Sequence, residues 1–236
     1  PFPRPDVHER LDRVLDKLKP DVVVACYGMN DGIYYPFAEE RFAAYRDGID
    51  RLIEKVHARG AKLVLLTPPP FDSLPLRDSG NLRPDGADEY AYFAMYVDYD
   101  RVLQRYARWI MEQHERVEMV IDLHTPITES LERRRIDEPN YSVAPDGIHP
   151  NDAGHRLIAD VILKAWGIDE WIEVPASIDQ ELRRRNSVLH DAYLSDIGHL
   201  RPGVAAGLPV AQAQQIAAEI DRSVALLLEQ QRQERR

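Results

Sequence analysis

The stretch DVVVACYGMND, residues 21–31, joins an apolar run to an abrupt polar turn. A β-branched run without polar alternation predicts a strand over 21–28 that is buried on both faces, as in a parallel sheet. Two similar runs follow, AKLVLLT (61–67) and EMVIDL (118–123). Because helical spacing fills the intervals, we predict right-handed crossovers and a three-layer α/β/α fold with a flavodoxin-like parallel sheet.

Apolar periodicity of 3.6 residues predicts the helices between and around these strands. The longest has an aromatic stripe that includes Tyr92, Tyr99 and Tyr106, which we interpret as one face packed into the core. Before it lies a loop of about 18 residues rich in Pro, Asp and Gly, a length typical of functional or mobile segments. The helices expected in this part of the chain cover 6–18, 39–59, 87–114, 125–135 (begun by Thr125 and Pro126) and 152–166.

The C-terminal part has no strand signal. Ser177 with Gln180 predicts the start of a helix that runs to about 198, and a last helix is expected over 209–232. We therefore predict an α/β domain over 1–168 and a helical hairpin extension over 169–236.

Composition narrows the classes of partner. The chain of 236 residues has 44% hydrophobic residues and a net charge of −10, which argues against nucleic acid or an anionic membrane as its main partner. No apolar run reaches the roughly 20 residues that span a bilayer. One cysteine excludes an internal disulfide. The oligomeric state and the compartment stay open, export to the periplasm or outside the cell included.

A polar cluster follows the first predicted strand. Gly28 allows a tight exit from the strand, and Asn30, followed by Asp31, presents an amide where ligands bind in open parallel sheets. Such an amide can stabilise the oxyanion of a tetrahedral intermediate. The alternative is an ordinary turn, because Asn, Asp and Gly are common turn formers.

A second cluster, DGIHP (146–150), precedes the helix at 152–166. An Asp three residues before a His can reach back to one ring nitrogen and orient the imidazole, as the acid of a serine triad does. The alternative for Asp146 and His149 is a turn cap followed by a histidine near a helix start.

Taken together, the two clusters resemble the blocks of the SGNH/GDSL hydrolase family over residues 5–168. Gly28, Asn30 and Asp31 look like its third block, and DGIHP looks like its fifth. The resemblance implies a serine ester hydrolase that cleaves acyl or acetyl esters of small molecules or carbohydrates. It also implies His149 as general base, Asp146 as its orienting acid and Asn30 as an oxyanion donor, without a cofactor or a metal.

One departure from the family pattern concerns the nucleophile. No Gly-Asp-Ser block precedes Gly28, and Ser79 in Asp-Ser-Gly (78–80) follows no strand, so we reject it as nucleophile. With Pro1 in place of Met, this predicts a chain that lacks the first strand and its serine, which leaves strand 21–27 as an exposed edge. Two alternatives stay open: a non-catalytic binding module of the same shape, and a serine supplied by a separate chain.

Other candidate residues are weaker. His124, His149 and His155 lack the helical spacing of a zinc motif, so no metal is expected. The aromatic residues after the first cluster, Tyr34, Tyr35 and Phe37, could line a pocket or pack against the neighbouring helix.

Overall fold

The computed structural model describes residues 6–169, 174–199 and 203–234. It divides into two compact units: Pro20–Asp169, and a second made of Pro1–Lys19 with Glu170–Arg236. The change of unit after Asp169 lies next to the boundary proposed from the sequence. Residues 1–19, however, group with the C-terminal helices, whereas the sequence placed them in the α/β part.

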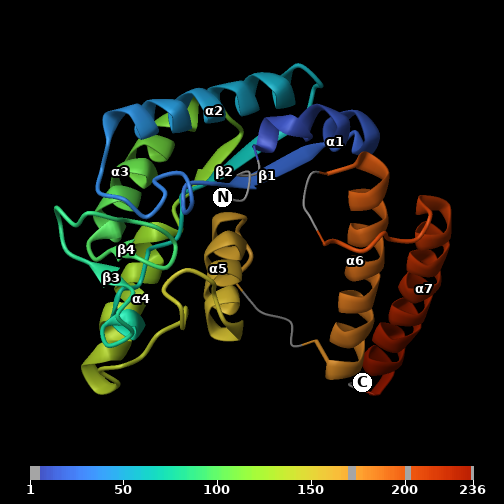
Figure 1. Cartoon of the computed structure of the whole chain (residues 1–236). Coiled ribbons are helices and arrows are strands. Elements are labelled where there is room, and N and C mark those ends of the chain that lie inside the picture. The colour runs from blue at the N-terminus through green and yellow to red at the C-terminus, as the bar shows by residue number, and fades with distance from the viewer. Residues whose placement is uncertain (1–5, 170–173, 200–202, 235–236) are drawn as a thin grey trace. The chain divides into compact units, whose positions relative to one another are not determined.

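A parallel sheet forms the middle of the first unit (Figure 1). Its strands are β1 (Val22–Cys26), β2 (Lys62–Leu66) and β5 (Met119–Ile121), in the order β1-β2-β5. Val24 is opposite Val64 in one pair, and Leu66 is opposite Ile121 in the other. The predicted α/β class with a parallel sheet is therefore confirmed.

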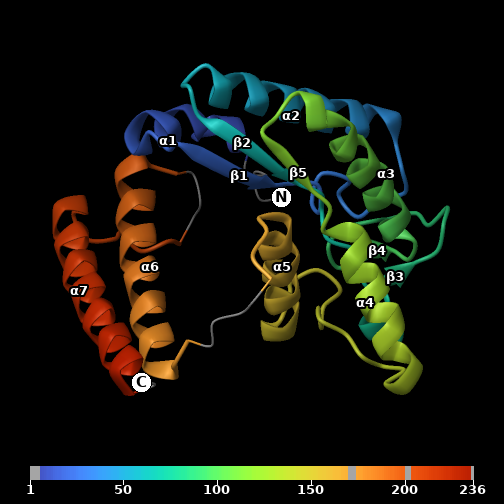
Figure 2. The same cartoon turned by 180° about the vertical axis from the view of Figure 1, so that it is seen from behind.

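Helices cover both faces of this sheet. In both views, α2 lies on one side of the sheet and α5 on the other (Figures 1 and 2). Helices α2 and α3 pack together through stacked rings of Tyr45 and Tyr106, whose centroids are 4.5 Å apart. The helices of this unit are α2 (Glu39–His57), α3 (Tyr99–Met111), which continues as a 3-10 turn η3 (Glu112–Glu115), α4 (His124–Asp137) and α5 (Asp152–Ala165).

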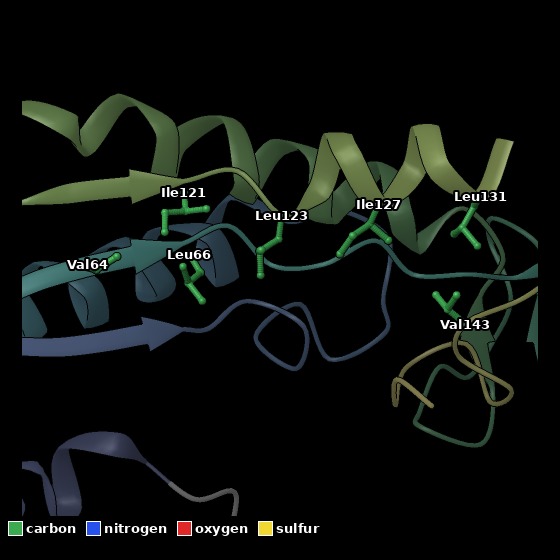
Figure 3. Packing of buried hydrophobic residues seen from close by; sticks show 7 residues of the cluster. All are labelled: Val64, Leu66, Ile121, Leu123, Ile127, Leu131 and Val143. Atoms are coloured by element: carbon green, nitrogen blue, oxygen red, sulfur yellow. The ribbon is translucent and has the colours of Figure 1, made fainter. Parts of the chain in front are cut away.

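The core on the α5 side is a continuous apolar cluster. It runs from the strands along α4 to the loop before α5, and apolar residues of α5 pack against it. Leu63 and Leu65 alternate with the cluster residues of β2 and are also fully buried, so the central strand is covered on both faces. Figure 3 shows the cluster, made of Val64, Leu66, Ile121, Leu123, Ile127, Leu131 and Val143.

Strand β1 differs from the prediction. The sequence predicted burial on both faces, but Val22 and Val24 keep 48% and 46% of their surface exposed. The reason is position in the sheet: β1 is last in the strand order and pairs only with β2 among the described residues. The predicted edge position of this strand agrees with that order.

The long helix predicted over 87–114 was wrong in its first part, because α3 begins only at Tyr99. Residues before it form hydrogen bonds to distant segments instead: the Met95 N–H bonds to Asn81 and the Tyr96 N–H to Tyr34. The stripe from Tyr99 onward is buried as expected, but Tyr92 is 73% exposed. Before α3 the chain forms a short 3-10 turn and a two-stranded parallel pair: η2 (Leu74–Leu76), β3 (Leu82–Arg83) and β4 (Met95–Tyr96).

Two predicted helix starts are also corrected. Helix α4 begins at His124, and the hydroxyl of Thr67, directly after β2, accepts the N–H groups of Leu123 and His124, at 2.8 and 3.0 Å. A buried threonine far away in sequence therefore satisfies two backbone donors at the start of the helix, and the predicted start at Thr125 is one residue late. Helix α6 has Pro175 at its N-cap, without a side-chain cap from Ser177 or Gln180.

The second unit is helical. An apolar contact of Ile178 with Ile220 and Val224 joins its two long helices, which run in opposite directions as a hairpin (Figure 1). The N-terminal helix binds to the end of α6, where the Arg13 side chain donates to the Ile197 carbonyl at 2.9 Å. Its elements are the 3-10 turn η1 (Val7–Glu9), α1 (Leu11–Leu18), α6 (Ala176–Ile197) and α7 (Val210–Glu234).

Every helix of the described residues is too short or too polar to cross a bilayer.

The paired residues Val24 and Val64 allow a direct test of the exposed edge. Val64 is 4% exposed, so Val64→Ala should lower the free energy of unfolding by about 2 kcal/mol through lost burial and a cavity. Val24→Ala should cost less than about 1 kcal/mol because its side chain is already half in water. Denaturant titration of both variants measures the difference. Equal costs would contradict the exposed position of β1.

Candidate active site

Asn30 lies in a tight turn directly after β1. Gly28 has φ 131°, and a side chain there would come within 3.0 Å of Pro68, so the strand exit requires glycine. The N–H of Asp31 donates to the Gly28 carbonyl at 3.2 Å, and the N–H of Ile33 donates to the Asn30 carbonyl at 3.2 Å. The side-chain oxygen Oδ1 of Asn30 accepts a hydrogen bond from the Tyr34 hydroxyl. The amide group of Asn30 therefore lies on an exposed turn with a fixed backbone.

Asp31 next to it is perturbed electrostatically. Desolvation raises the pKa of its carboxyl, and hydrogen bonds with the backbone of Gly28 and of Asp31 itself oppose that rise.

Asp146 and His149 form the pair that the sequence predicted from their spacing. Asp146 Oδ2 lies 2.6 Å from His149 Nδ1, while Oδ1 accepts the N–H groups of Ile148 and His149 at 3.0 and 2.7 Å. The carboxylate thus fixes both the loop and the ring. The His149 side chain is 81% exposed, which leaves Nε2 as the ring nitrogen for a substrate.

The carboxylate itself is electrostatically stabilised. Desolvation raises its pKa, but the hydrogen bonds from the His149 ring and from the N–H groups of His149 and Ile148 outweigh that effect, and the pKa of Asp146 falls below its usual value. Asp146 is therefore ionised in the range where a neutral imidazole acts as a base.

Glycine and asparagine shape the loop that carries this pair. Gly147 has φ 78°, and a side chain on it would lie 2.7 Å from the Asp72 carbonyl oxygen. Asn151 caps α5 by accepting the Gly154 N–H at 3.0 Å. A side chain at Gly154 would meet the Val143 carbonyl at 2.7 Å, so the Asn-x-x-Gly lead into α5 is a packing requirement.

Asp72, which was not predicted from the sequence, stabilises the same loop. Its side chain is 5% exposed and accepts from Arg135 on α4 at 2.6 Å and from the Ser142 hydroxyl at 2.7 Å. Its backbone N–H donates to the Gly147 carbonyl at 3.1 Å. The sequence does not indicate this ion pair. Arg135 is one of three consecutive arginines on α4, and nothing in the sequence distinguishes it from the other two as the partner of an Asp 63 residues earlier.

A second His–Asp pair is buried nearby. His124 Nε2 lies 3.1 Å from Asp100 Oδ1, which also accepts the Phe71 N–H at 2.9 Å. The pair holds the residue before Asp72 rather than facing solvent, since the His124 side chain is 8% exposed. Among the described residues, no group of three or more His, Cys, Asp or Glu side chains has a metal-binding arrangement.

Aromatic contacts connect the Asn30 turn with the His149 loop. The Tyr99 hydroxyl donates to the Met29 carbonyl at 2.8 Å, and the Tyr99 ring lies 5.7 Å from the ring of Phe71. Phe71 in turn lies under Gly147, where a side chain would come within 3.1 Å of it. No hydrogen bond joins Asn30 to Asp146 or His149 in the described part of the chain, so their convergence on one substrate stays a prediction.

The remaining aromatic residues after Asn30 pack against neighbours. Tyr35 contacts Tyr90 with centroids 5.2 Å apart, and Phe37 lies against Phe42 of α2 at 5.6 Å. Arg105 of α3 covers the other side of Phe37, 4.2 Å from the ring centroid. Tyr35 also has Arg41 of α2 over its ring, at 4.9 Å from the centroid. Of the two interpretations from the sequence, these contacts favour packing against the helices.

A parallel sheet covered by helices on both faces, together with an exposed imidazole oriented by a carboxylate, defines a class of α/β protein suited to general-base chemistry. The chain belongs to the GDSL-like lipase/acylhydrolase family, whose model matches residues 4–157. It is accordingly a hydrolase that acts on ester bonds.

A solved structure of similar fold is a variant of Axe2, an acetyl xylan esterase from Geobacillus stearothermophilus. The TM-score is 0.51 at 20% sequence identity, and the match covers 71% of this chain and 69% of that one. The similarity supports the SGNH-type fold predicted from the sequence. A search of curated proteins found no match.

The Asp72–Arg135 ion pair should contribute to the free energy of unfolding. Arg135→Ala leaves the buried carboxylate of Asp72 without its cation and should cost about 3–5 kcal/mol of unfolding free energy. Arg133→Ala on the same helix is the control: its ion pair with Glu129 is exposed, and the cost should stay within about 0.5 kcal/mol. Denaturant titration gives both values. Similar costs for the two arginines would contradict a supporting role of Asp72.

The lowered pKa of Asp146 generates a prediction about pH. A carboxylate with a depressed pKa in the folded state stabilises the fold above its unfolded pKa, and this contribution disappears as the pH falls through the folded value. Asp146→Asn should therefore destabilise the protein at pH 7, and the difference from the wild type should shrink in acid. Urea titrations from pH 7 to pH 3 measure it.

The partner residue provides the control. In His149→Ala, the pKa of Asp146, followed by carboxyl ¹³C NMR, should rise toward its usual value, because the ring hydrogen bond lowers it. An unchanged pKa would show that the Asp146–His149 contact is not formed in solution.

Proposed function

We propose that the protein is a serine esterase in which His149 is the general base, Asp146 orients it, and Asn30 donates to the oxyanion. The observation that carries the proposal is the 2.6 Å contact of Asp146 with Nδ1 of an exposed His149 ring. With Nδ1–H donated to the carboxylate, Nε2 carries the lone pair that a base requires.

The nucleophile in this proposal is a serine outside the 236 residues. Two loop serines are engaged locally: the Ser79 hydroxyl donates to the Leu76 carbonyl at 2.7 Å, and the Ser142 hydroxyl donates to Asp72. Neither contacts His149 through a hydrogen bond in the described structure. Because the family's Gly-Asp-Ser block is not found before Gly28, we assign the nucleophile to a segment upstream of this chain.

The reaction would proceed in two halves. The serine oxygen attacks the ester carbonyl carbon while His149 Nε2 takes the hydroxyl proton, and the resulting oxyanion accepts a hydrogen bond from the Asn30 side-chain amide. Collapse of the intermediate breaks the ester C–O bond, and His149 returns the proton to the departing alcohol. Water then attacks the acyl-serine by the same steps and releases the acid.

The substrate class is an acyl or acetyl ester of a small molecule or a carbohydrate. The family supports ester chemistry, and the name of the structural neighbour, an acetyl xylan esterase, supports an acetylated carbohydrate. An acetyl group is also compatible with a site whose aromatic neighbours are occupied by packing contacts.

Hydrolysis of p-nitrophenyl acetate by the complete gene product tests the proposal. His149→Ala should lower kcat by about 10²–10⁴-fold, the usual contribution of a general base. His190→Ala is the control, since that histidine lies on α6 outside the α/β unit. Equal rates in wild type and His149→Ala would contradict the triad assignment.

Labelling with a fluorophosphonate distinguishes the proposal from its alternatives. A modified serine upstream of residue 1 supports the triad as proposed, and a modified serine on a co-purified polypeptide supports a separate chain. A modified serine within residues 1–236 contradicts the assignment of the nucleophile. Absence of both labelling and hydrolysis supports a non-catalytic binding module.

A further inference from the structure

The turn after Asn30 has an unusual backbone. Ile33 and Tyr34 have φ values of 60° and 62°, the left-handed region that residues with a side chain rarely adopt and β-branched residues adopt least. Such conformations persist where the surrounding structure imposes them, and they concentrate at functional sites. Two such residues follow one another here, and they lie three and four positions after Asn30. We therefore looked for what this backbone positions.

The consequence of this backbone is the position of one hydroxyl group. The turn brings the Tyr34 side chain close to Asn30, so that the Tyr34 hydroxyl donates to Oδ1 of Asn30. A carboxamide has one acceptor end and one donor end. With Oδ1 bound to Tyr34, the Nδ2 group is directed away from Tyr34.

We propose that Tyr34 is a positioning residue that orients the Asn30 carboxamide so that its Nδ2–H faces the oxyanion of the reacting ester. The proposal rests on the function proposed above, in which Asn30 is an oxyanion donor. Tyr34 does not touch the substrate in this account and acts only through Asn30.

The Tyr34 ring is itself held firmly. It is 7% exposed, and its centroid lies 5.2 Å from that of Tyr99, which is fully buried on α3. The backbone carbonyl of Tyr34 accepts the Tyr96 N–H at 2.9 Å. The hydroxyl of Tyr34 therefore has a defined position relative to the sheet.

Tyr99 links both sides of the turn. Desolvation raises the pKa of the Tyr99 hydroxyl, against an opposing hydrogen bond with the backbone of Tyr34, so the group stays protonated and donates to the Met29 carbonyl. A side chain at Gly32 would lie 2.7 Å from the Tyr99 oxygen, so this position requires glycine. The residue before Asn30 and the residues after it are thus fixed on one buried ring.

An oriented donor matters because catalysis favours dipoles that need no reorganisation as charge develops. An exposed asparagine without such a contact would rotate about its side-chain bonds and could present Oδ1, which repels an oxyanion. The Tyr34 hydroxyl removes that orientation. The expected kinetic effect falls on the transition state rather than on substrate binding.

A double-mutant cycle with p-nitrophenyl acetate and the complete gene product tests this role. Asn30→Ala should lower kcat by about 10²–10³-fold. Tyr34→Phe keeps the ring and should lower kcat by about 10-fold with little change in KM, as expected for a lost hydrogen bond that acts in the transition state. In the Asn30→Ala background, Tyr34→Phe should have no further effect, because the group it orients is gone.

Tyr90→Phe is the matched control. Its hydroxyl also makes two local hydrogen bonds, to the Pro84 carbonyl and from the Ala87 N–H, but it does not touch Asn30. Its kcat should stay within about twofold of wild type, the scale of a change that leaves transition-state contacts intact. In the same proteins, Tyr34→Phe should shift the Asn30 side-chain amide resonances in ¹⁵N NMR, and Tyr90→Phe should leave them in place.

The outcomes separate the two proposals. An Asn30→Ala variant with wild-type kcat would overturn the oxyanion role and the positioning role together. A strong effect of Asn30→Ala with additive effects of Tyr34→Phe, or with unchanged amide resonances in Tyr34→Phe, would overturn the positioning role alone.

Discussion

The loops of the α/β unit depend on one buried carboxylate, that of Asp72. Removal of this charge from water is expensive unless cations and donors surround it, and Arg135 and Ser142 provide them. The same residue binds Gly147 through its backbone, so the segment after β2 and the loop that carries His149 cannot change shape independently. The loop that carries the exposed imidazole is therefore tied to a residue whose own side chain is held by buried partners.

The candidate site separates reactive groups from the groups that hold them. Asn30 and His149 are exposed, whereas their supports, Tyr34, Tyr99 and Asp72, are buried. This division has a physical reason. A base and an oxyanion donor must meet a substrate, but only side chains locked by packing can keep them in one orientation before the reaction begins.

The sheet and the chemistry meet at β1. This strand ends at the Asn30 turn, and its outer residues Val22 and Val24 are half exposed at the edge of the described sheet. Membership of the family shows that the chain acts on ester bonds, whereas the position of the nucleophile is our proposal. Strand β1 comes before the Asn30 turn in the chain, and the serine proposed as nucleophile would come before β1. This strand therefore connects the fold with the proposed activity.

Features that depend on neighbouring residues could be predicted before folding: the apolar strands, the helical stripes, and the reach of Asp146 to the ring of His149 three positions later. Features that depend on distant partners are visible only in the folded chain. Arg135 lies 63 residues from Asp72, and the hydrogen bonds of Met95 and Tyr96 to other segments delay the start of α3, against a continuous helical pattern. Local periodicity records which face of an element is apolar, but it carries no information on which distant backbone or charge will satisfy a buried polar group. The left-handed turn that brings Tyr34 to Asn30 is short in sequence, but its tyrosine packs on Tyr99, a residue far away in the chain, so it too is visible only in the fold.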